Sequence, residues 1–494
     1  MDMFYHPHMD REIESLIERI HPPRVCIDND SCRECTVVKV DSANKHGILL
    51  EMVQVLTDLD LIISRSYISS DGGWFMDVFH VTDQAGKKLT DETLMLHIQQ
   101  ELCNTRRKGD TSSDEDDEST SDPYRCEGPH SLQNTALEMT GLDRPGLLSE
   151  LAAVLVDLGC TVTSGMAWTH NDRAACIIYV EDALKAGPIK DPIRLGHVQE
   201  QLQNVVEAHG DIGERKSVRL RNLAAGRTHT ERRLHQLMYA DRDYESCRAC
   251  HGESSGEHKK GCDGTHVSVS RCKDKGYWVV NVRSRDRPKL LFDTVCVLTD
   301  LHYVVFHAAI RSKSSMADQE YFIKHDIGAG GSCLDEESER QKLILCLIAA
   351  IERRVSHVRL TPPTTIKGLR VDIRTKNRMG LLSNVTRVFR ENGLSVSRVE
   401  IGTQGDKAVG SFFLTDCSGQ EVNPNIAELV RQECGGTVVT DHKSPYRVPK
   451  SSSSSLSVMD ETTNNLVANP IVSIGNMLWS QIERLSGSFG SIRS

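Results

Sequence analysis

Residues 141–157 read Gly-Leu-Asp-Arg-Pro-Gly-Leu-Leu-Ser-Glu-Leu-Ala-Ala-Val-Leu-Val-Asp. This order predicts the end of a strand, a tight loop and an amphipathic helix. Counted from Gly146, apolar residues recur at spacings that place them on one face of an α-helix. They are Leu147, Leu148, Leu151, Val154, Leu155 and Leu158. The stretch therefore predicts a strand–loop–helix corner whose helix buries one face.

The same corner recurs at residues 41–58, 286–300 and 376–391, with Gly47, Lys289 and Gly380 in the place of Gly146. A hairpin pattern and a second helix pattern follow each corner. The spacing of the corners is uneven and much longer than the roughly 20–50 residues of a solenoid repeat. Each copy is therefore a whole βαββαβ domain. We predict an α+β protein of four tandem ferredoxin-like domains with antiparallel sheets.

These patterns divide the chain into units and connections. An antiparallel sheet with helices on one face leaves edge strands free, so we expect the four units to pair side by side. The run of five acidic residues at 114–118 marks a solvated linker. The predicted segments are a leader (1–34), a first unit (35–110), an acidic linker (111–133), a second unit (134–220), a connector with a Cys/His-rich loop (221–275), a third unit (276–361), a fourth unit (367–445), and a Ser-rich linker with a C-terminal amphipathic helix (446–494).

Bulk composition excludes several classes of protein. A formal net charge of −10 argues against a nucleic-acid binder, which needs a basic face. The longest clean apolar run, 343–351, is far shorter than the ~20 residues of a membrane span. The N-terminus lacks the apolar segment of a signal peptide. With 16 cysteines scattered through apolar runs, the chain favours a reducing compartment, and we expect it in the cytoplasm, the nucleus or both.

The repeated motif resembles a known domain. Asp-Arg-Pro-Gly-Leu-Leu (143–148) after a strand, with this helix face and a following hairpin, looks like the ACT domain, a small-molecule-sensing module of amino-acid metabolism. Four such units, the connector 232–245, the segment 286–300 and the closing segment 479–494 together resemble the plant ACT-domain-repeat (ACR) proteins. The resemblance implies binding of a free amino acid without catalysis or cofactor. The second unit is also similar to the C-terminal regulatory modules of bacterial PII uridylyltransferases, whose catalytic parts have no counterpart here.

The loop of the corner has chemistry that suits an amino acid. A helix N-terminus presents unpaired backbone N–H groups that favour a carboxylate, and a glycine there allows close approach. Asp143 and Asn377 are suited to receive an α-ammonium group or an amide. The predicted ligand-binding residues are Asn44, Gly47, Asp143, Arg144, Gly146, Leu147, Asn377 and Gly380. The alternative is structural: Asp143 caps the helix and Gly146 turns the chain. Lys289 favours that alternative in the third unit.

Other motifs leave the function open between three hypotheses. Cys247, Cys250, His251 and Cys262 are weak zinc-ligand candidates, because only the first half has paired spacing, and a flexible surface loop is the favoured interpretation. No nucleophile elbow, phosphate-binding loop or dinucleotide fingerprint occurs, so we expect no enzymatic activity. The chain is predicted to be an amino-acid-binding sensor, a ligand-free scaffold for protein partners, or a regulatory subunit of an enzyme of amino-acid or nitrogen metabolism. A homodimer through paired units is a further expectation.

Overall fold

The structure of the protein is a computed structural model. The described residues are 24–44, 47–70, 73–104, 134–170, 173–185, 187–208, 217–221, 229–244, 265–272, 276–313, 315–325, 334, 336–352, 368–417, 422–423 and 425–441. The acidic linker, the four zinc-ligand candidates and the segment 446–494 therefore lie outside them. Among the helices of the described part, none has the length and apolarity needed to cross a membrane.

The first and third units share one antiparallel sheet of eight strands, in the order β1-β2-β4-β3-β11-β12-β10-β9. The two units join where β3 pairs with β11, with Tyr67 opposite Ala309. The strands are β1 (Arg24–Asp28), β2 (Thr36–Ala43), β3 (Ile62–Ser70), β4 (Trp74–Thr82), β9 (His266–Cys272), β10 (Tyr277–Arg285), β11 (Tyr303–Lys313) and β12 (Met316–His325). The predicted pairing of units is thus confirmed within one chain.

The second and fourth units share the other eight-stranded sheet, in the order β16-β13-β15-β14-β6-β7-β5-β8. Here β14 pairs with β6, with Glu400 opposite Met166. The strands are β5 (Thr135–Leu142), β6 (Cys160–His170), β7 (Arg173–Asp182), β8 (Ser217–Arg221), β13 (Gly368–Lys376), β14 (Leu394–Gln404), β15 (Lys407–Asp416) and β16 (Thr437–Asp441). The first unit therefore pairs with the third and the second with the fourth, and no unit pairs with its neighbour in sequence.

The four predicted corners are confirmed. Each first helix begins directly after a residue in the left-handed region: Gly47, Gly146 and Gly380 with φ of 83°, 86° and 75°, and Lys289 with φ of 63°. Glycine adopts this conformation without strain. The first helices are α2 (Ile48–Asp58), α4 (Leu147–Asp157), α7 (Leu290–Asp300) and α9 (Leu381–Glu391), and the second helices are α3 (Glu92–Asn104), α5 (Pro192–Glu207), α8 (Glu337–Glu352) and α10 (Ile426–Cys434).

The first and third units differ from the predicted strand order. In the second and fourth units β8 and β16 close the sheet after the second helix, as βαββαβ requires. In the first and third units that edge position is taken by β1 and β9, which precede the corner strand. A short antiparallel hairpin reaches this position as readily as a strand returning from the helix. Residues 24–28, assigned to the leader, and β9, assigned to the connector, thus belong to the first sheet. Residues 353–361, the end of the predicted third unit, lie outside the described residues.

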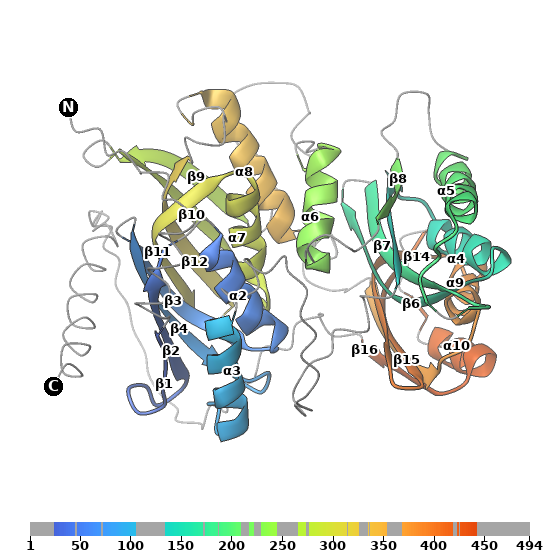
Figure 1. The fold of residues 1–494 in the computed structure, drawn as a ribbon, viewed down its shortest axis with the longest axis horizontal. Helices are drawn as coiled ribbons and strands as arrows, with labels where there is room; N and C mark the ends of the chain where they lie inside the picture. The colour runs from blue at the N-terminus through green and yellow to red at the C-terminus, as the bar shows by residue number, and fades with distance from the viewer. Residues whose placement is uncertain are drawn as a thin grey trace, which may run out of the picture.

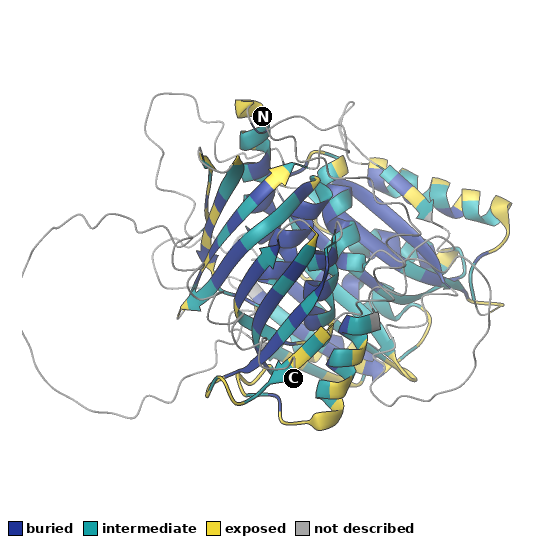
Figure 2. Cartoon of the chain, turned by 60° about the vertical axis from the view of Figure 1, so that its left-hand side comes forward, coloured by how far each residue is buried: buried dark blue, intermediate teal, exposed yellow. Residues whose placement is uncertain are grey.

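A further helix, α6 (Thr230–Ala240), joins the two bodies. It stands between the helices of the first–third pair and the free face of the second sheet (Figure 1). Leu234, Leu237 and Met238 of α6 are buried in one apolar core with residues of α7 and with Trp168 of β6. In Figure 2 exposed residues gather mainly at loops and helix ends, while the strands are largely buried or intermediate. The connector therefore has a structural role that the sequence reading did not predict.

Candidate functional site

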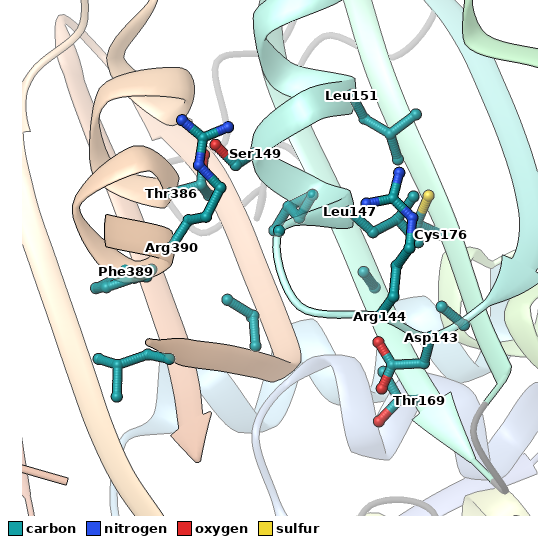
Figure 3. Close-up of a pocket in the computed structure, with 16 residues that line it drawn as sticks. Asp143, Arg144, Leu147, Ser149, Leu151, Thr169, Cys176, Thr386, Phe389 and Arg390 are labelled. Atoms are coloured by element: carbon teal, nitrogen blue, oxygen red, sulfur yellow. The ribbon is translucent and has the colours of Figure 1, made fainter. Parts of the chain in front are cut away.

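A pocket opens at the seam between the second and fourth units. The loop before α4 forms one side through Asp143, Arg144, Gly146 and Leu147, and α9 forms the other side through residues that include Arg390 (Figure 3). It encloses about 550 Å³ of space, mouth included. Four of the predicted ligand-binding residues are thus brought together at one site.

Gly146 is closely packed against α9 at this seam. A Cβ atom added at its position would lie 3.0 Å from Cδ of Arg390 and 3.3 Å from its Cγ. The positive φ of Gly146 would strain any side chain there as well. The glycine therefore lets the aliphatic stem of Arg390 pass over the loop and reach the pocket.

The two arginines of the pocket have different roles. Arg144 donates from Nη1 to Oε1 of Glu150 at 2.8 Å and from Nη2 to the Val205 carbonyl at 3.3 Å, which ties the loop to α4 and α5. The third unit repeats this pair, with Nη1 of Arg287 2.8 Å from Oδ2 of Asp293. Arg144 thus holds the loop in shape. Arg390 is the pocket cation that sequence reasoning missed, because only the pairing of units places α9 beside α4.

A second pocket lies at the same seam, with the roles of the two units exchanged. The loop residues Asn377 and Gly380 face α4 across about 620 Å³ of space, mouth included. Val156 of α4 lies 3.8 Å from the position of an added Cβ at Gly380. It takes the place that Arg390 of α9 has beside Gly146 in the first pocket. This exchange of arginine for valine leaves the second pocket without that cation. The two pockets of one seam therefore suit different ligands, or one ligand with different affinity.

In the first–third pair the loop of the third unit is already engaged. Nζ of Lys289 lies 2.8 Å from Oε1 of Glu231 on α6. The side chain of Glu231 is 2% exposed. The side chain that departs from the glycine pattern thus anchors the connector helix. In the first unit, Nδ2 of Asn44 donates to Oγ of Ser70 at 2.7 Å, and Gly47 keeps its left-handed conformation. Cγ2 of Thr299 on α7 lies 3.9 Å from the position of an added Cβ at Gly47, so α7 is the partner helix of this corner.

One strand position distinguishes the four units. Cys176, Gln319 and Gly410 each line a pocket from the strand paired with the corner strand. The strand registers place Asp77 at the same position in the first unit. Asp77 is 1% exposed, and its Oδ1 has no hydrogen-bond partner among the described residues. Burial raises the pKa of this carboxyl well above its usual range, against a lowering contribution from the Ser69 backbone.

Asp77→Asn is expected to make the protein less sensitive to rising pH. A carboxyl whose pKa is raised in the folded state stabilises fully below its unfolded value of about 3.9 and loses that contribution as pH rises. The variant should therefore gain free energy of unfolding over the wild type between pH 5 and 7.5, by up to about 1.4 kcal/mol per pH unit. Urea denaturation at both pH values measures this. Asp318→Asn, at an exposed site, is the control, and an equal difference at both pH values would contradict the prediction.

The described residues hold no cluster of three or more histidine, cysteine or acidic side chains placed to bind a metal ion. The candidates Cys247, Cys250, His251 and Cys262 lie outside those residues. The favoured interpretation of that segment as a surface loop, and the weaker zinc hypothesis, therefore both stay predictions.

Two shared sheets, four glycine- or lysine-capped corners and pockets at the unit seam define a protein built from tandem ACT domains. The profile of the ACR family N-terminal ACT domain matches residues 31–109, and that of the ACT domain matches residues 370–435. The chain is similar to ACT domain-containing protein ACR1 of Arabidopsis thaliana, with 51% identity over 501 residues and 100% coverage of both chains. It belongs to this ACR family of plant ACT-domain proteins.

Other relatives agree with this assignment. ACT domain-containing protein ACR3 of Arabidopsis thaliana is 48% identical over 445 residues, covering 90% of this chain and 92% of the relative. A bifunctional uridylyltransferase/uridylyl-removing enzyme of Azospirillum brasilense is 40% identical over 81 residues, or 16% of this chain and 9% of the enzyme. The full-length relatives are named for their ACT domains and not for an enzymatic activity.

Proposed function

We propose that the protein is a non-catalytic sensor that binds a free amino acid in the pocket between the second-unit loop and α9. The observation that carries the proposal is the pair of opposite charges, Asp143 and Arg390, on opposite sides of one open pocket (Figure 3). An amino acid at neutral pH carries both charges. Its ammonium group suits the Asp143 carboxylate, and its carboxylate suits Arg390 together with the N-terminus of α4.

The pocket also offers a route from binding to regulation. Its two walls belong to different units, so a ligand held between them favours the arrangement of α4 and α9 that fits it best. By linkage, any partner that prefers the same arrangement binds more tightly when the ligand is present. The proposal places this sensor in the cytosol or the nucleus, in keeping with the 16 cysteines of the sequence and the free thiols of the described ones.

The proposal is tested by thermal-shift and calorimetric titration of the full-length chain with each of the twenty amino acids at millimolar concentration. We expect at least one to raise the melting temperature. Absence of a shift with all twenty would overturn the sensor and leave the ligand-free scaffold, which the engaged Lys289–Glu231 pair already favours for the first–third pair. A saturating stoichiometry of four per chain would contradict the assignment to the second–fourth pair.

A matched pair of substitutions locates the site. Gly146→Ala and Gly380→Ala both place a side chain at positive φ and should cost a similar amount, about 1–2 kcal/mol, in folding free energy. Only the first presses on the stem of Arg390, which must shift by a few tenths of an ångström. Gly146→Ala is therefore expected to weaken amino-acid binding by about tenfold or more, the loss of one charge-assisted contact, while Gly380→Ala binds as the wild type does. Isothermal titration measures both, and the reverse result would move the site to the second pocket.

A further inference from the structure

Two cysteines lie together at the start of β2. Cys32 and Cys35 have their Sγ atoms 3.2 Å apart, with the Cys35 thiol donating to Cys32. Cys35 is 6% exposed, whereas Cys32 is only partly buried and lies nearer to solvent. An accessible sulfur beside a buried one, with two residues between them in sequence, is the arrangement in which one thiol can react and the other can resolve the product.

The turn that carries this pair is held at both ends. Oδ1 of Asp28 accepts from the backbone N–H groups of Asp30 and Ser31, both at 2.9 Å. Oδ1 of Asn29 accepts from Oγ1 of Thr36 at 2.6 Å, and Nδ2 of Asn29 donates to the Leu89 carbonyl at 2.8 Å. These bonds fix the segment between β1 and β2, so the two sulfur atoms are held close together in the folded protein.

The electrostatic surroundings favour a thiolate on Cys32. The hydrogen bond from Cys35 lowers the pKa of Cys32, with smaller contributions from the Glu34 backbone and the Lys88 ammonium group. Burial raises the pKa of Cys35 to about 12, so this thiol stays protonated and keeps its proton for the hydrogen bond. The difference assigns the nucleophilic role to Cys32 and the resolving role to Cys35.

We propose that Cys32 and Cys35 form a redox-active dithiol that closes to an intramolecular disulfide on reaction with a hydroperoxide. The Cys32 thiolate attacks one peroxide oxygen, the O–O bond breaks, and the alkoxide or hydroxide takes a proton and leaves. Cys32 then carries a sulfenic acid. The Cys35 sulfur attacks Sγ of Cys32, the S–O bond breaks, and hydroxide leaves as water with the Cys35 proton. Two thiols lose two electrons and two protons, and ROOH becomes ROH and water.

The position of the dithiol connects it to the seam of the first sheet. Cys32 packs against a small apolar cluster on the sheet face away from the main core, formed by Val37, Tyr67, Val78 and Ala309. Tyr67 and Ala309 are opposite each other where β3 meets β11. The disulfide would therefore form beside the junction of the first and third units, in the other sheet from the proposed amino-acid pocket.

The chain offers a direct test, because Arg33 lies between the two cysteines and trypsin cleaves after arginine. Full-length protein is reduced, freed of reductant, treated with about one equivalent of hydrogen peroxide, alkylated and digested. We expect a disulfide-linked pair of peptides, 25–33 joined to 34–39, that separates on reduction. The link should form at least tenfold faster in the folded protein than in the same chain in urea. An equal rate in both, or oxidation of exposed Cys417 without this link, would overturn the proposal.

Three variants separate the dithiol from its neighbour Cys26, which lies on the same peptide. Cys26→Ser should keep the linked pair. Cys35→Ser should lose it and leave a sulfenic acid on Cys32 that dimedone traps on peptide 25–33, while Cys32→Ser should lose both products. A linked pair that disappears in Cys26→Ser, or survives in Cys32→Ser, would assign the chemistry to Cys26 and overturn the proposal. Circular dichroism checks that each variant is folded. If a variant fails to fold, the comparison of folded and urea-unfolded wild-type protein still tests the proposal.

Discussion

Replacing Asp293 with alanine is expected to lower the free energy of unfolding by about 3–5 kcal/mol. Asp293 is fully buried on α7 and holds two cationic or polar partners. Its Oδ2 lies 2.8 Å from Nη1 of Arg287, and its Oδ1 lies 3.0 Å from Nε2 of His235 on α6. The Arg287 side chain is 2% exposed, so the variant leaves a buried guanidinium without its carboxylate. Urea denaturation followed by circular dichroism measures the loss.

The matched control is an ion pair in the same unit that lies at the surface. Asp318 and Arg283 are 3.7 Å apart, and their side chains are 59% and 67% exposed. Asp318→Ala should change the free energy of unfolding by less than about 1 kcal/mol. Losses of similar size in the two variants would show that the buried contacts of Asp293 with Arg287 and His235 contribute no more to stability than a surface ion pair does.

Replacing Trp168 with alanine is expected to cost about 3–5 kcal/mol as well, through the cavity it leaves. Trp168 is 1% exposed on β6, and its ring meets that of His235 edge to face at 5.7 Å. Because this indole joins the second sheet to α6, its loss should also loosen the contact between the two paired bodies. We expect the unfolding of the variant to separate into two calorimetric transitions, one for each pair of units.

Trp278→Ala is the control for this second effect. Trp278 lies on β10, is partly buried, and is covered by Arg271 and Arg340 at 5.9 and 5.5 Å from the ring centre, away from the junction with the second sheet. It should cost less, about 1–2 kcal/mol, with no splitting of the transition. A single transition in Trp168→Ala, shifted no more than in Trp278→Ala, would argue against coupling through α6.

Local patterns predicted the repeated unit well. The apolar spacing after Gly47, Gly146, Lys289 and Gly380 predicted four helices, and each begins within one residue of the expected position. The reason is physical: helix periodicity and a left-handed cap depend on residues a few positions apart. The alternation of apolar residues predicted the hairpins for the same reason.

The candidate site was only half predictable. Asp143, Gly146 and Leu147 belong to the repeated corner, so their place on the pocket wall follows from it. Arg390 belongs to another unit, more than two hundred residues away in sequence. Its approach to Gly146 exists only because β14 pairs with β6, and nothing in either local pattern states which unit meets which.

The sequence by itself determined the unit, its four copies, the glycine caps and the loop chemistry, since each depends on interactions within a few residues. The tertiary structure alone decided the pairing of the first unit with the third and of the second with the fourth. It also decided that β1 and β9 take the two outer edges of the first sheet, and that Lys289 anchors α6. All four units present an edge strand of similar backbone, so the choice of partner lies in side-chain packing across the seam and in the helix buried between the two bodies.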